Sequence, residues 1–100
     1  MSSVDLQLAL QRLPLPDGDI VVLLDREKLE AGSDQHRNLY RTSSSGEVKW
    51  QVADYQPMPF LSTFTHIEIT EEVIEAHNFD GGCYKISVQD GSVLGSYLAK

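Results

Sequence analysis

Two histidines and two glutamates alternate with other residues in the last third of the sequence: His66, Glu68, Glu75 and His77. If Glu71-Glu72 forms a two-residue hairpin turn, antiparallel pairing sets the two histidines opposite each other and Glu68 opposite Glu75, all on one face. Imidazole and carboxylate groups together can bind a divalent metal. Facing carboxylates also cost a fraction of a kcal/mol, which any cation would relieve. This face is therefore a solvated surface, a contact for a basic protein, or a metal site.

The charge of the whole chain favours the protein contact over nucleic acid. Fifteen acidic residues against eight basic ones give a formal net charge of −7. Such a field repels phosphate backbones, and the sequence has no lysine and arginine cluster to overcome it. A basic partner would be attracted. The predicted partner surface contains Glu68, Glu71, Glu72, Glu75, His66 and His77. No cofactor and no bound metal are expected.

Catalytic signatures are absent from the sequence, which has no nucleophile elbow, phosphate-binding loop, dinucleotide fingerprint or zinc-protease motif. Cys83 would need a histidine nearby to act as a nucleophile. It follows Gly81-Gly82 at the start of a predicted strand, which favours the role of a small buried apolar residue. The chain is therefore predicted not to be an enzyme.

Cellular location is predicted from cysteine use and from the lack of apolar runs. One cysteine cannot form an intramolecular disulfide, so nothing argues for secretion. The longest apolar run, residues 20–24, is far shorter than the roughly 20 residues of a membrane helix. The amino terminus carries an acid, Asp5, where a signal peptide would carry lysines. We expect a cytoplasmic protein without membrane contact.

The elements that must position these side chains are predicted to be strands. Residues 19–25 form a continuous apolar run typical of a central strand buried on both faces. Residues 38–42 and 47–52 flank a Ser-Ser-Ser-Gly turn and predict a hairpin with Val48, Trp50 and Val52 on one face. Residues 26–37 are predicted to be a surface loop or a brief helical turn and residues 53–62 a loop, and residues 5–13 fit a short helix and a strand about equally.

The last third predicts two more hairpins over residues 64–70, 73–79, 83–88 and 93–98. Asp80-Gly81-Gly82 marks one turn and Asp90-Gly91 another, and Asp-Gly between alternating apolar runs is a strong hairpin signal. Pairing about Asp90-Gly91 predicts three cross-strand pairs on a buried face: Val88 with Val93, Ile86 with Gly95, and Tyr84 with Tyr97.

These elements predict a mostly β protein forming one domain over residues 1–100. The expected architecture is an antiparallel hairpin meander of about six or seven strands, an open sheet or a small sandwich, with at most one short helix.

A weak internal repeat accompanies this plan. Leu39-Tyr40-Arg41-Thr42, Gly46 and Val48 match Tyr84-Lys85-Ile86-Ser87, Gly91 and Val93 at a constant offset. Residues 38–52 resemble the outer hairpin of a blade in quinoprotein-like β-propellers. Two copies cannot close a ring that needs at least four blades, so the resemblance implies a blade-like meander without the quinone cofactor.

In size, acidity and hairpin content the chain is similar to small bacterial immunity proteins that neutralise a toxin. The function predicted from the sequence is thus a non-catalytic, immunity-type protein that binds a basic toxin. One alternative is a small metal-binding protein or enzyme using His66, Glu68, Glu75 and His77. Another is an accessory subunit of a larger assembly.

Overall fold

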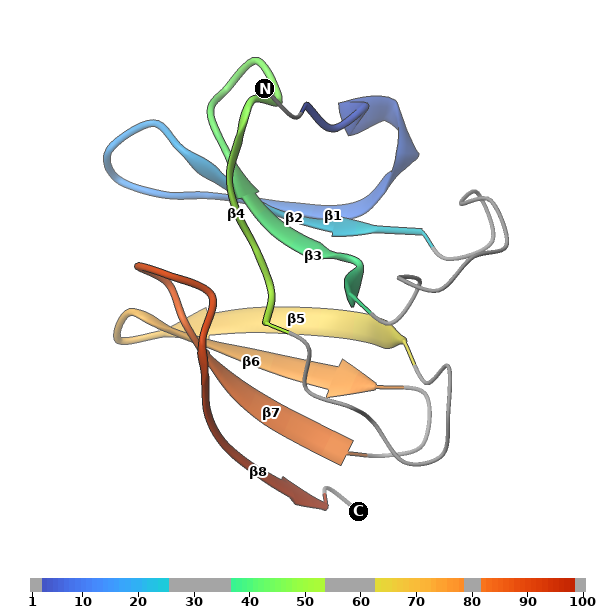
Figure 1. Cartoon of the computed structure of the whole chain (residues 1–100), viewed down its shortest axis with the longest axis vertical. Coiled ribbons are helices and arrows are strands. Elements are labelled where there is room, and N and C mark those ends of the chain that lie inside the picture. The colour runs from blue at the N-terminus through green and yellow to red at the C-terminus, as the bar shows by residue number, and fades with distance from the viewer. Residues whose placement is uncertain (1–2, 26–36, 54–62, 79–81, 99–100) are drawn as a thin grey trace.

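Eight strands form two four-stranded antiparallel sheets in the computed structural model, which describes residues 3–25, 37–53, 63–78 and 82–98 (Figure 1). In each sheet the strands are neighbours in the order of the chain. The first sheet contains β1 (Ala9–Pro14), β2 (Ile20–Leu24), β3 (Leu39–Thr42) and β4 (Val48–Gln51). The second contains β5 (Phe64–Thr70), β6 (Val73–Asn78), β7 (Gly82–Ser87) and β8 (Val93–Leu98). The predicted mostly β fold is confirmed.

The structure has one strand more than the six or seven predicted, and the additional strand is β1. It lies mainly in residues 5–13, whose pattern fitted a helix and a strand about equally. A short 3-10 turn, η1 (Leu6–Leu8), comes first, and the carboxylate of Asp5 accepts a hydrogen bond from the Gln7 amide at its start. The chain then pairs with β2, with Leu13 opposite Val21. Pairing with a strong apolar strand thus decides the conformation of this segment.

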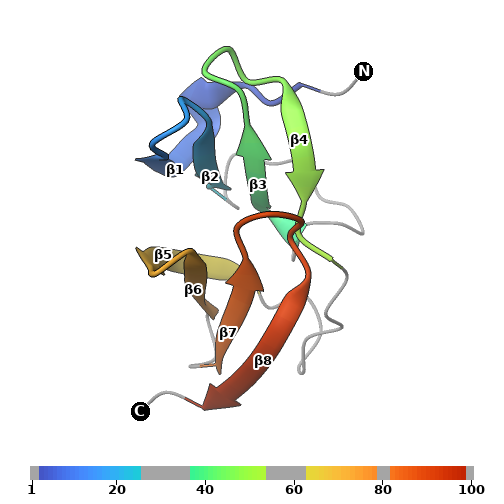
Figure 2. The same ribbon diagram turned by 90° about the vertical axis from the view of Figure 1, so that its left-hand side faces the viewer.

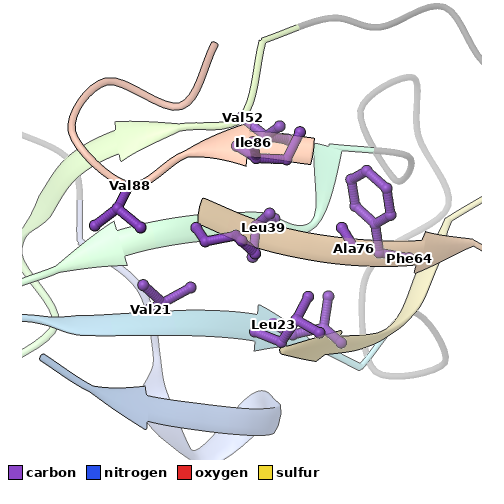
Figure 3. Close-up of a cluster of buried hydrophobic side chains, with 10 residues drawn as sticks. Val21, Leu23, Leu39, Val52, Phe64, Ala76, Ile86 and Val88 are labelled. Carbon is purple, nitrogen blue, oxygen red and sulfur yellow. The ribbon is translucent and has the colours of Figure 1, made fainter. Parts of the chain in front are cut away.

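The core lies between the two sheets, which stack with their inner faces together (Figures 1 and 2). Apolar side chains from both sheets meet there, and most are labelled in Figure 3: Val21, Leu23, Leu39, Val52, Phe64, Ile67, Ile74, Ala76, Ile86 and Val88. Val22 and Leu24, on the opposite face of β2, are also buried, and the 3-10 turn η1 contacts this strand. The predicted central strand with two buried faces is therefore confirmed.

Two amide side chains join the first sheet to the edge strand β5. The Gln11 side chain accepts from the Ile67 amide at 2.7 Å and donates to the Ile67 carbonyl at 3.1 Å. Asn38, buried, accepts from the Phe64 amide and donates to the carbonyls of Phe64 and Leu24. The backbone of β5 thus finds partners where no neighbouring strand supplies them.

The predicted register of the last hairpin is wrong. Ile86 pairs with Val93, and Tyr84 pairs with Ser96 instead of Tyr97, whose backbone lies opposite Cys83. The predicted Asp90-Gly91 turn is part of a longer connection in which the Ser87 amide donates to the Ser92 carbonyl. The register shifts by one residue between Ile86–Val93 and Lys85–Gly95, so Leu94 is an extra residue in β8. Burial was predicted correctly for Ile86 and Val88, while Val93 and Tyr84 pack partly buried against the core.

The β7–β8 connection is held against the first sheet, which explains its length. The Val88 carbonyl accepts from Trp50 Nε1 at 2.9 Å and from Arg41 Nη1 at 3.0 Å. The Ala53 amide donates to the Gly91 carbonyl at 3.0 Å. These contacts favour the observed loop over a tight two-residue turn.

The predicted hairpin around residues 43–46 is confirmed, with Arg41 opposite Trp50 and Gly46 at a φ of +94°. The predicted loops at 26–37 and 53–62, and the turn at 80–82, fall mainly outside the described residues. No helix among the described residues is long and apolar enough to cross a membrane.

Candidate functional site

The outer face of β5 and β6 has the arrangement that the sequence predicts. His66 pairs with His77 and Glu68 with Glu75, and Thr70 pairs with Val73 across the turn. The two imidazole rings lie 5.9 Å apart between centroids. Ile67, Ile74 and Ala76 turn to the core, so the pleat directs the polar set outward.

The turn of this hairpin has a conformation that its residues do not favour. Glu71 and Glu72 have φ values of 50° and 66°. Two consecutive left-handed residues are the geometry of a type I′ turn, for which Asn-Gly is preferred because a β-carbon is crowded there. Both glutamates are exposed, so local packing does not account for their presence.

Only histidines lie close to the Glu68 carboxylate among the ion-pair partners that the described residues provide. Its Oε2 lies 3.7 Å from His77 Nε2 and 4.0 Å from His66 Nε2. The Glu68 side chain is 61% exposed. In the β6–β7 ladder, Lys85 is opposite Glu75. The exposed carboxylates of Glu68, Glu71 and Glu72 thus make this hairpin acidic, while the charge of Glu75 lies opposite that of Lys85.

Cys83 joins this face, which the sequence interpretation did not foresee. It pairs with His77 in the β6–β7 ladder and is buried. One donor atom each from Glu75, His77 and Cys83 lie within 4.8 Å of one another. His66 and Glu68, the other members of the set that the sequence offered as an alternative metal site, are not part of this group. The sequence did contain a signal for this pairing. If the apolar residues of the two strands face the same core, Tyr84 lies opposite Ala76 and Ile86 opposite Ile74. That register places Cys83 opposite His77.

A groove of about 440 Å³ opens at the end of the molecule where turns of both sheets meet. It is lined by Leu15, Pro16, Asp17, Arg41, Glu72, Val88 and Gln89. Arg41 is bound on one side by Asp17 at 2.6 Å and by Asp19 at 2.9 Å. The Asp19 amide and then the Arg41 guanidinium lower the pKa of Asp17. The groove therefore holds a neutralised arginine beside the carboxylate of Glu72.

The comparison with curated proteins returns no match. A family model described as "Domain of unknown function (DUF7957)" matches residues 2–97, which include both sheets except for Leu98 at the end of β8. The chain belongs to this DUF7957 family.

Proposed function

We propose that this protein is a non-catalytic binding protein that holds a basic protein partner on the acidic β5–β6 hairpin. The observation that carries the proposal is the Glu71-Glu72 turn. Residues at positive φ without glycine cost about 1 kcal/mol or more each, and such strain concentrates at functional positions. The two carboxylates at the tip therefore lower the stability of the turn. A partner that binds these carboxylates would explain why glutamates occupy both positions.

The rest of the hairpin supports the same partner chemistry. Glu68 and Glu75 continue the acidic surface from the tip along the outer face. On a chain with a net charge of −7, this surface would steer a basic protein toward it and speed association at low ionic strength.

The groove beside Glu72 gives this partner a specific contact. Leu15 and Val88 offer apolar walls for the aliphatic stem of a lysine or arginine, while Glu72 offers a carboxylate for its charged end. Burial of the Cys83 thiol supports a non-catalytic role, because an attacking nucleophile must reach its substrate.

The test compares the wild-type chain with the Glu71→Asn/Glu72→Gly variant. Asn-Gly suits a type I′ turn, so the variant should be about 1 kcal/mol more stable while lacking both carboxylates. Partners captured from the source cell by each chain would be compared by quantitative mass spectrometry. A basic protein should be retained by the wild type and depleted at least tenfold on the variant. Equal retention of every basic protein would contradict the proposal.

The finer proposal, an immunity-type function, has its own test. The captured partner, expressed without this chain, should stop growth of the host cell, and co-expression of this chain should restore it. With purified proteins, the association rate should fall as salt rises and should be lower for the turn variant. A partner that is harmless alone would instead favour an accessory subunit.

A further inference from the structure

Three different metal-binding groups converge on the outer face of the second sheet. Glu75 and His77 lie two residues apart on β6 and so project from the same face. Cys83 is directly opposite His77 on β7. We propose that Glu75, His77 and Cys83 bind one zinc ion, a site that goes beyond the proposed partner binding, shares Glu75 with the acidic surface and does not involve the Glu71-Glu72 turn.

The distances suit a zinc ion after small side-chain movements. Zinc lies about 2.0–2.3 Å from oxygen, nitrogen and sulfur ligands, which places the ligand atoms of a tetrahedral site roughly 3.3–3.8 Å apart. The three donor atoms are already within 4.8 Å of one another. Glu75 and His77 are partly exposed, so rotation of their ends can supply the remaining movement of about 1 Å while the paired backbones stay in place.

The donor types select the metal. Thiolate and imidazole favour zinc over magnesium or calcium, which prefer all-oxygen sites. The Cys83 thiolate and the Glu75 carboxylate would together balance the two positive charges of the ion. Glu68 Oε2, 3.7 Å from His77 Nε2, is a further carboxylate close to the site, and it can orient the imidazole ring or occupy the fourth position.

A purely structural role for these residues is the competing explanation. Lys85 opposite Glu75 would then pair with that carboxylate, and Cys83 would serve as a small apolar side chain. This explanation predicts no specific metal binding, so metal titration separates the two.

The first experiment uses the wild-type chain without an affinity tag and with its thiol reduced. Cobalt(II) chloride is added and the near-ultraviolet charge-transfer absorption of a cobalt–thiolate bond is recorded. Because the sequence has one cysteine, any such band reports Cys83. The band should saturate at one equivalent and disappear when zinc chloride is added. Absence of the band at several equivalents of cobalt would overturn the proposal.

The second experiment measures zinc binding by calorimetry for three variants. Cys83→Ser and His77→Gln should each weaken binding at least tenfold, whereas His66→Gln, a histidine on the same face, should bind as the wild type does. If His66→Gln abolished binding and Cys83→Ser retained it, the metal would belong to the alternative set of His66, Glu68, Glu75 and His77, and this site would be wrong. The wild-type cobalt spectrum decides the proposal even if a variant fails to fold.

Discussion

At the scale of single residues, Gly91 lies against the Trp50 ring, where the β7–β8 loop meets the first sheet. Its φ is +76°, and a β-carbon built there would lie 2.5 Å from Cε3 of the Trp50 ring. The indole also donates to the Val88 carbonyl, so the ring is held from two sides. Glycine is thus required both by the backbone conformation and by the space available.

We expect Gly91→Ala to lower the free energy of unfolding by about 2 kcal/mol or more, because strain and overpacking act together. Gly18→Ala is the matched control, with a φ of +97° and no atom within 4 Å of the added carbon. It should cost only about 1 kcal/mol. Urea denaturation measures both, and equal losses would mean that the Trp50 ring moves aside freely.

A second residue-scale prediction concerns acid stability. The Asp19 amide, followed by the Arg41 guanidinium, lowers the pKa of Asp17 in the folded chain. Because this pKa is lower in the folded chain than in the unfolded chain, ionised Asp17 stabilises the fold. The stabilisation is fully present above the unfolded pKa, near 3.8, and is lost as the pH falls through the folded pKa. Asp17→Asn should therefore make the loss of stability between about pH 5 and pH 2 smaller.

Denaturant melts at a series of pH values would measure this effect. Asp90, whose pKa is lowered by the Ser92 hydroxyl and amide, provides a second case in the β7–β8 connection. Asp90→Asn should reduce the acid loss independently, and the double variant should show the sum. Acid profiles of Asp17→Asn and wild type that run parallel would show that the Asp17 contacts contribute nothing in solution.

At the scale of elements, β5 depends on two side chains for the hydrogen bonding of its free edge. Asn38 is 1% exposed and bonds to three backbone groups, so its loss leaves buried donors and acceptors without partners. Gln11 makes two such bonds in a partly buried position. Both side chains also protect the edge from pairing with another chain.

We expect Asn38→Ala to destabilise the fold by about 3 kcal/mol and Gln11→Ala by about 1 kcal/mol. Amide hydrogen exchange within β5 should distinguish the effects of the two substitutions. The Phe64 amide should exchange faster in the first variant and the Ile67 amide in the second, since those are the amides that each side chain accepts from. Uniform changes along β5 would argue against two separate attachments.

At the scale of the whole molecule, the two sheets share one apolar core. Leu39 of the first sheet and Ile86 of the second are both fully buried in the same cluster. Neither sheet covers its own inner face, so each needs the other to exclude water.

The shared core predicts that the two sheets unfold as one unit. Leu39→Ala and Ile86→Ala should each cost about 3 kcal/mol, and each should reduce the protection of slowly exchanging amides equally in both sheets. The measurement is native-state hydrogen exchange in low denaturant. If Leu39→Ala lowered protection in β1–β4 alone, the sheets would be separate cooperative units.

The sequence by itself determined the acidic character of the chain and the hairpins whose signals are local. The β5–β6 register, with His66 opposite His77, follows from a two-residue turn and a strict alternation of apolar residues. A slip by one position would expose Ile67 and Ile74, so the pattern admits one answer.

Tertiary structure decided the features that depend on contacts between distant segments. The β7–β8 register shifts because Trp50 and Arg41 bind the Val88 carbonyl, 38 and 47 residues away along the chain. β1 becomes a strand because β2 offers it a partner. Cys83 reaches Glu75 and His77 only through the β6–β7 pairing. The hairpin signals within single segments did not decide these pairings, because their free energy comes from surfaces that meet only in the folded chain.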